Sequence, residues 1–292
     1  GRDKAVKGTI LQAYAGRGSI EGDPFIMMQP VTGIHDLAIW YPEQEADNIQ
    51  PYPPAIQMGD PSVWGNDYVT VDNIEFVNAY LGYKNNPNMG GCPIVRNIYG
   101  TPLKSGIRID SLADVGRIEN CDFSPLYWEN SGLPGAPSDK DSHRSYIYEN
   151  GIAYEMSRND WSYGRWLTAD RYGVGFYALN SFCEGAWNGE SRISNMYPNG
   201  ENYGMKFSNC HIGVAIEDTS NSGMVITHTE IDNCENGFVA RNTMASKISL
   251  IGWTINATDN AILNEGTGQV MMQEMDIESG KVSLSAGYAS IA

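Results

Sequence analysis

The sequence predicts an all-β fold: a right-handed parallel β-helix solenoid with long loop insertions, formed by residues 1–292 as a single domain. Two repeated patterns predict it, a six-residue apolar segment and a glycine-led segment that follows it, both recurring at coil-length spacing. The composition agrees, because 32 Gly, 14 Pro and only 8 Lys are typical of a turn-rich β protein.

The first pattern is a six-residue segment with apolar residues at its first, fourth or last places and a polar or small residue at its third. Four copies near the C-terminus have last residues 19, 24 and 22 positions apart, at 207–212, 226–231, 250–255 and 272–277. Earlier copies occupy 34–39, 71–76 and 118–123. Apolar alternation over such short segments indicates strands with one buried face.

The second pattern is a glycine followed by residues that alternate between a core and the outside. Its copies begin at Gly106, Gly151, Gly173, Gly213 and Gly237. We expect these glycines to align at the corners of successive coils, because glycine adopts backbone angles that other residues resist. Strands that recur in this way stack in register as a solenoid, where each coil buries its apolar face against the next.

An Asp or Asn stands third in several of the six-residue segments, at Asp36, Asn73, Asn120 and Asn209. Such side chains can stack at a corner and satisfy backbone groups and one another. We expect a structural role for them.

Two long excursions interrupt the coils, at about 124–150 and 182–203. Insertions in solenoids commonly emerge on one face, where binding occurs. Residues 124–203 hold 15 of the 31 aromatics, among them Tyr127, Trp128, Trp161, Tyr163, Trp166, Tyr172, Tyr177, Trp187 and Tyr197. We expect Trp128, Trp161, Tyr177 and Trp187 to stack on sugar rings; the alternative is that these rings only pack the loops onto the coil.

The net charge of −16 would repel nucleic acid or an anionic membrane. A polyanionic glycan would need bound cations or a local cluster of Lys and Arg, whereas a neutral glycan needs neither. Five cysteines without a C-x-x-C pair, and four scattered histidines, indicate no metal site, and no cofactor is expected. No apolar run reaches the length of a membrane span.

Several segments resemble the pectate-lyase-like superfamily, namely residues 34–44, 51–54, 110–125 and 158–161. The resemblance implies a β-helix, polysaccharide-active relatives such as glycoside hydrolases, fructotransferases and lyases, and an extracellular or cell-surface location. Members usually begin with a Gly-Asp-Gly-rich first coil and a capping helix, which this sequence lacks. We therefore expect a missing N-terminal cap or first coils, with a separate N-terminal segment or a homo-oligomer covering the open end.

Glycoside hydrolysis requires two carboxyl groups, one as acid and one as nucleophile or base. If Gly106 and Gly151 align, Asp110 and Glu155 lie on neighbouring strands about 4.8 Å apart. The catalytic candidates are Asp110, Asp114, Glu155 and Asp160. Arg158 and Glu43 are further candidates for substrate binding; the alternative is a corner network of salt bridges.

The leading hypothesis is a glycoside hydrolase, or a related glycosyl-transferring enzyme, acting on a neutral or weakly charged oligosaccharide or polysaccharide. A non-catalytic glycan-binding or adhesive β-helix is the second hypothesis. A polysaccharide lyase is the third, and it would need an Arg or Lys as the base.

Overall fold

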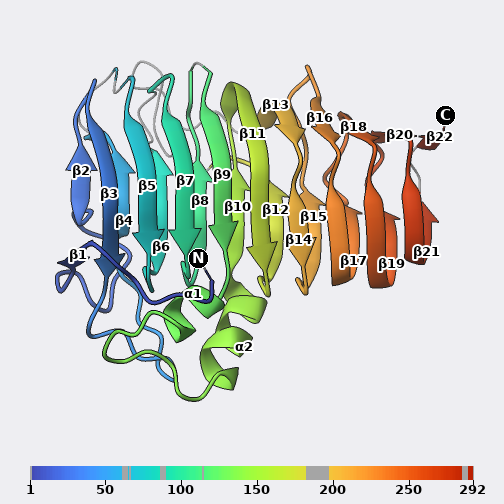
Figure 1. The fold of residues 1–292 in the computed structure, drawn as a ribbon. Coiled ribbons are helices and arrows are strands. Elements are labelled where there is room, and N and C mark those ends of the chain that lie inside the picture. Colours follow the sequence, from blue (N-terminus) through green and yellow to red (C-terminus); the bar gives the residue numbers. More distant parts are fainter. Residues whose placement is uncertain are drawn as a thin grey trace.

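The computed structural model describes residues 2–60, 65, 67–85, 90–113, 115–181, 197–284 and 289–291. Within these ranges the protein is all-β, with one 22-stranded sheet whose named strands pair in parallel, and two short helices. Figure 1 shows the strands side by side along the length of the molecule. The all-β class is confirmed, and the long parallel sheet is compatible with a parallel β-helix.

Three parallel ladders, which we call A, B and C, make up the sheet. Ladder A contains β1 (Thr9–Gln12), β3 (Gly33–Trp40), β5 (Thr70–Phe76), β7 (Ile94–Gly100), β9 (Arg117–Phe123), β11 (Asn159–Asp170), β14 (Lys206–Ser208), β17 (Glu230–Ala240), β19 (Thr254–Asn264) and β21 (Asp276–Leu284).

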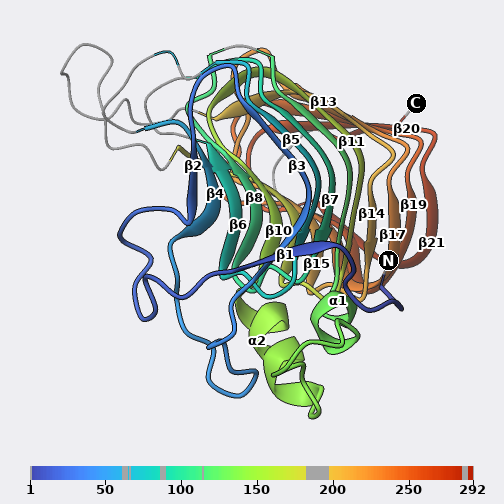
Figure 2. The same cartoon turned by 60° about the vertical axis from the view of Figure 1, so that its left-hand side comes forward.

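Ladder B contains β2 (Ile26–Met28), β4 (Pro54–Met58), β6 (Leu81–Asn85), β8 (Ser105–Ile109), β10 (Ile152–Met156), β12 (Val174–Ala178) and β15 (Ile212–Ile216), and continues in the second halves of β17, β19 and β21. Ladder C comprises the first halves of β3, β5, β7, β9 and β11, followed by β13 (Pro198–Tyr203), β16 (Met224–Thr227), β18 (Lys247–Ile251), β20 (Gln269–Gln273) and β22 (Ala289–Ile291). The chain passes through C, A and B in turn, as the end-on view in Figure 2 makes clear.

The six-residue pattern matches the observed register in six of its seven copies. Segments 34–39, 71–76 and 118–123 share one register, with β7 between the last two, and 226–231, 250–255 and 272–277 stack directly on one another. The predicted copy at 207–212 is wrong. Phe207 pairs with Ile231, the last residue of the segment 226–231, so Phe207 ends a six-residue segment and does not begin one. The apolar spacing identified the strands but not every starting residue.

The predicted alignment of the glycines is wrong by two residues in two coils. Ser105 pairs with Ile152 and Ile107 with Tyr154, so Ala153, and not Gly151, lies beside Gly106. In the next coil Gly175 takes this place, since Tyr154 pairs with Phe176.

Close packing explains why glycine recurs at this place. A Cβ on Gly106 would lie 2.4 Å from the carbonyl oxygen of Ala153 and 2.5 Å from the ring of Phe123. The φ of Gly106 is not positive, so its lack of a side chain matters here and its backbone freedom does not. The rings of Phe123 and Tyr154, both fully buried, fill the interior beside it.

The predicted stack of corner side chains is confirmed for Asp36, Asn73 and Asn120, whereas Asn209 lies at a different corner. Asn73 donates to Asp36 at 2.6 Å, and Asn120 donates to Asn97 at 2.6 Å. All four residues have φ between 52° and 60°, a left-handed conformation that Asn and Asp tolerate. A second corner contains Asn209, which donates to Asp170 at 2.7 Å.

The two insertions do not emerge on one face, contrary to expectation. Residues 124–151 join β9 of ladder A to β10 of ladder B and contain α1 (Leu126–Glu129) and α2 (Asp141–Asn150). The second insertion joins β12 of ladder B to β13 of ladder C, and its residues 182–196 lie outside the described residues. The insertions therefore leave from different corners. None of the described helices is long and apolar enough to cross a bilayer.

Candidate functional site

The predicted catalytic pair Asp110 and Glu155 does not lie side by side in ladder B. Glu155 pairs with Arg108, and Ile109 pairs with Met156, which places Asp110 two residues further along than Glu155. The error follows directly from the glycine register described above.

Glu155 forms an ion pair instead. The Arg108 guanidinium donates through Nε to Oε2 at 2.8 Å and through Nη2 to Oε1 at 3.1 Å. The Glu155 side chain is almost fully buried, whereas that of Arg108 is about one-fifth exposed. This bidentate geometry is a strong structural contact.

Asp110 is buried at the corner between ladders B and C. Its Oδ1 accepts hydrogen bonds of 2.7 Å from the backbone N–H of Ser111 and from the hydroxyl of Ser181. Asn85 hydrogen bonds to the Asp110 backbone through both its amide nitrogen and its amide oxygen. These contacts hold the turn.

Arg158, Asp160 and Trp161 lie at the same corner as Asp110. Arg158 is 9% exposed and donates through Nη2 to Asp160 at 3.2 Å, while its Nε and Nη1 have no hydrogen-bond partner among the described residues. Asp160 is exposed, and Trp161 is 37% exposed with φ of 63°. Asp160, predicted as catalytic, therefore lies beside Arg158 and at the same corner as Asp110, whereas Glu155 does not.

The other predicted residues are dispersed. Trp128 is fully buried in α1 and cannot present its face to a sugar. Tyr177 is half-buried and donates to Glu217 at 2.9 Å; burial, with this hydrogen bond, raises its pKa to about 12. Glu43 is exposed in the loop between β3 and β4, at the corner between ladders A and B. Asp114 and Trp187 lie outside the described residues.

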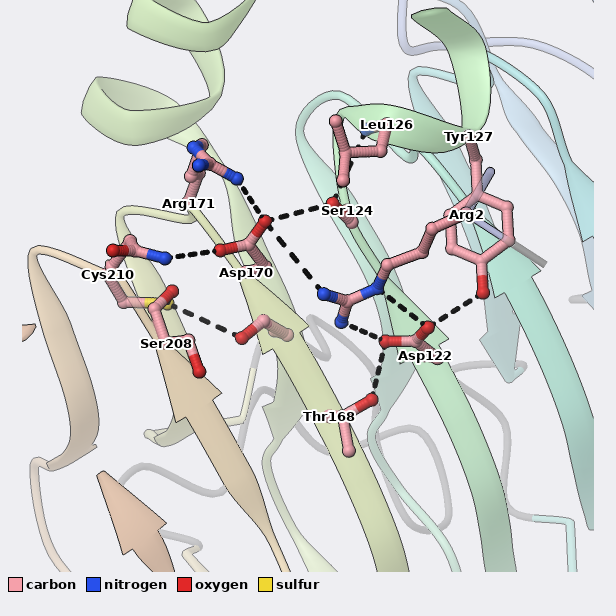
Figure 3. Close-up of polar contacts among 12 residues, drawn as sticks. Arg2, Asp122, Ser124, Leu126, Tyr127, Thr168, Asp170, Arg171, Ser208 and Cys210 are labelled. Atoms are coloured by element: carbon pink, nitrogen blue, oxygen red, sulfur yellow. Dashed lines mark hydrogen bonds and ion pairs between the residues drawn. The ribbon is translucent and has the colours of Figure 1, made fainter. Parts of the chain in front are cut away.

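A second pair of acids, Asp122 and Asp170, lies under the N-terminal residues (Figure 3). The Arg2 guanidinium lies between the two carboxylates, hydrogen bonded to Asp122 and 3.9 Å from Asp170. Asp122 also accepts from Tyr127 at 2.7 Å and from Thr168 at 2.5 Å. Burial would raise the pKa of Asp122, but the hydrogen bonds and charge of Arg2 outweigh it and hold the pKa below its usual value. These acids are occupied by structural contacts.

The outer face of β11 carries the residues best placed to meet a ligand. Along this strand Ser162, Gly164 and Leu167 are buried, while Tyr163 is half-buried and Arg165 and Trp166 are exposed. Alternation places successive side chains on opposite faces of a strand. The outward residues of β11 thus form one row.

Two adjoining cavities flank this row, and they share Tyr163, Arg165 and Glu201. The aromatic cavity has a volume of about 350 Å³ and is lined by Tyr163, Arg165, Trp166, Glu201, Asn202, Tyr203, Val225 and Thr227. The arginine cavity has a volume of about 510 Å³ and is lined by Ile94, Arg96, Arg117, Glu119, Tyr163, Arg165 and Glu201. Together they form a groove that crosses β7, β9, β11, β13 and β16.

Trp166 is the most unusual residue of the groove. Its φ is 53°, and its side chain is 54% exposed. A bulky residue in the left-handed region is a strained outlier, and such outliers cluster at functional sites. Trp166 stands where Asn120 stands in the preceding coil, so it replaces a corner amide with an indole ring.

Two rings continue the surface beyond Trp166. Its ring centroid is 6.5 Å from that of Tyr203 in an edge-to-face arrangement, and Tyr203 is 5.0 Å from the ring of His228. On the other side the Arg165 guanidinium lies 5.7 Å from the centre of the Tyr163 ring. Flat apolar faces beside hydrogen-bonding groups suit a sugar ring, whose faces are apolar and whose rim carries hydroxyls.

Two carboxyl groups, Glu119 and Glu201, line the arginine cavity. Glu119 pairs in register with Arg165, and Glu201 pairs with Tyr163. Across the described part of the chain, neither carboxylate makes a side-chain hydrogen bond or an ion pair. Both can therefore act on a bound molecule.

The sequence contained a signal for this groove that the prediction did not use. Trp161, Tyr163 and Arg165 alternate with the buried residues Ser162 and Gly164, which marks one outward row. Glu119 and Glu201 gave no comparable signal, because 82 residues separate them and only the coil brings them together.

Among the described residues no group of three or more His, Cys, Asp or Glu is arranged to hold a metal ion. In comparisons with known proteins, no family model, curated protein or solved structure matches the chain. The resemblance to the pectate-lyase-like superfamily stays a prediction.

Proposed function

We propose that this chain is a right-handed parallel β-helix that binds an oligosaccharide or polysaccharide in the groove over β11 and hydrolyses it. One observation carries the proposal: β11 places the charged Arg165 on the shared wall of two adjoining cavities, of which one is lined by the exposed Trp166 and the other by two carboxyl groups. The right-handed sense is supported by the near-universal hand of crossovers between parallel strands.

The aromatic cavity supplies binding. In our proposal one sugar ring stacks on Trp166 or Tyr203, and one of its hydroxyls hydrogen bonds to Thr227. Stacking of this kind contributes apolar burial without requiring a charge on the ligand.

The arginine cavity supplies the chemistry. Glu119 and Glu201 are the proposed acid and base, replacing the predicted pair Asp110 and Glu155. One carboxyl group donates a proton to the leaving oxygen, and the other acts as nucleophile or activates water. Arg117 and Arg165 would orient the substrate between them.

The test is a hydrolysis screen on a panel of oligosaccharides with Glu119→Gln, Glu201→Gln and Trp166→Ala. We expect each Gln variant to retain binding while turnover falls at least a hundredfold, because acid–base catalysis typically contributes that much. Trp166→Ala should weaken binding. Glu43→Gln is the matched control, since it removes an exposed carboxylate at a different corner. Full turnover in both Gln variants contradicts the catalytic assignment.

A non-catalytic glycan-binding module is the second candidate. The exposure of Trp166 and Tyr203, 54% and 44%, favours it, because an open platform does not exclude water as most catalytic sites do. Binding with no turnover on any substrate of the panel would select this candidate. A lyase would reveal itself in the same screen by an unsaturated product that absorbs in the ultraviolet.

A further inference from the structure

The groove concentrates arginine residues on an otherwise acidic protein, beside the carboxylates of Glu119 and Glu201. The net charge of the chain is −16, yet three of its eleven arginines, Arg96, Arg117 and Arg165, line the arginine cavity. A local Arg cluster is what an anionic group on a glycan requires, and guanidinium is well suited to carboxylate or sulfate because its donors form a planar fork.

The three guanidinium groups are not equally engaged. Arg96 donates to Asp72 through Nε at 3.0 Å and through Nη2 at 2.7 Å, which neutralises it. Arg117 and Arg165 make no side-chain hydrogen bond or ion pair with any described residue, and Arg165 instead lies over the ring of Tyr163. Two cations with available donors therefore line this cavity.

The positive charge stops at Arg165. Beyond it the aromatic cavity contributes Trp166, Tyr203, Val225 and Thr227 and no further arginine, whereas Glu201 lines both cavities. A neutral sugar suits these residues, whereas a second anion there would meet an apolar surface without an arginine beyond Arg165. The groove is thus polarised along its length, with its cationic part at one end.

We propose that the natural ligand is a glycan with a single acidic group, a carboxylate or a sulfate ester, on the unit held by Arg117 and Arg165, next to a neutral unit over Trp166 and Tyr203. This proposal rests on the function proposed above and narrows its substrate class. The proposal also excludes uniform polyuronides as the preferred ligand, because their next unit would place a second anion over the aromatic cavity, where no arginine lies beyond Arg165.

The test uses the full chain on a glycan array that carries neutral oligosaccharides, their counterparts with one uronic acid or one sulfate ester, and polygalacturonate. The best neutral and singly acidic pair is then titrated calorimetrically at about 20 and about 300 mM NaCl, which brackets weak and strong screening. We expect the singly acidic member to bind about tenfold more tightly at low salt, and the preference to shrink at high salt. The uronate and sulfate arms show which anion is preferred.

Arg117→Gln and Arg165→Gln should each weaken binding of the acidic member several-fold more than binding of the neutral member, so that the preference for the acidic member falls. Arg17→Gln is the control, because Arg17 is exposed and pairs with Glu45 at 3.5 Å outside the groove. Unchanged circular dichroism and melting temperature show that a variant is folded.

Each outcome is decisive. Equal binding of both members of the pair, or tightest binding of polygalacturonate, overturns the single-acid proposal and leaves glycan binding standing. A preference that survives both Arg variants also overturns it. If folded protein binds nothing on the array, the function proposed for the groove fails together with this inference.

Discussion

Gly204 lies directly beside Trp166 on the outer surface, and its missing side chain leaves room for the indole ring. A Cβ on Gly204 would lie 2.9 Å from Cδ1 of Trp166. Gly252 has nearly the same backbone angle, φ 67° against 68°, but a Cβ there would make only an ordinary contact of 3.5 Å with His228. Gly252 is therefore a natural control for Gly204.

We expect Gly204→Ala to weaken glycan binding about five- to tenfold, because the methyl group displaces the stacking ring. Gly252→Ala should carry the same backbone cost, about 1 kcal/mol, without affecting affinity. Calorimetry measures the affinity and urea unfolding the stability. Equal losses of affinity in the two variants would mean that the position of the Trp166 ring does not matter.

Glu155→Gln should lower the free energy of unfolding by about 1–3 kcal/mol, because it leaves the Arg108 guanidinium without its carboxylate partner. Turnover by the folded variant should be unchanged. Urea unfolding and the hydrolysis assay together check this. Unaltered stability with lost turnover would return Glu155 to the catalytic role that the sequence suggested.

Asp122 should make the protein sensitive to acid. Its pKa is lowered in the folded state, so its contribution to stability is complete above the unfolded pKa of about 3.9 and is lost as pH falls through the lower folded value. The slope of stability against pH below about pH 4 should therefore become shallower in Asp122→Asn. Denaturant unfolding between pH 2 and 6 measures it, and an unchanged slope would contradict the role of Arg2 as its partner.

Substitution of Asn97, a corner residue, should lower the stability of the protein. Its φ is 55°, it donates to Asp72 at 2.7 Å, and it accepts from Asn120 at 2.6 Å. Asn97→Ala loses both hydrogen bonds and strains the backbone, so we expect a loss of about 2–3 kcal/mol in the free energy of unfolding. Asn97→Gly should recover about 1 kcal/mol of this, because glycine accepts the left-handed angle. Identical losses would exclude the backbone contribution.

Gly106→Ala tests the spacing between coils. The added methyl group would overlap the Ala153 carbonyl and the Phe123 ring, so we expect at least about 2 kcal/mol of destabilisation. Gly33→Ala is the control, since its nearest contact would be an ordinary 3.6 Å. Thermal unfolding of the two variants compares them.

The sequence alone determined the strand class, the coil-length recurrence and the corner amides. These properties are local: alternation marks a half-buried strand, and an Asn at a fixed place in each repeat can stack on its equivalent one coil away. The six-residue copies at 34–39, 71–76 and 118–123 were therefore found at their true register.

Only the tertiary structure decided which side chains share a site. Glycines that look equivalent in the sequence differ by two residues in register, because Ala153, and not Gly151, occupies the place beside Gly106. Because of this two-residue offset, Asp110 does not lie beside Glu155, and Glu155 instead forms an ion pair with Arg108. Glu119 and Glu201 line one cavity because β9 and β13 both pair with β11, an arrangement that no local pattern records.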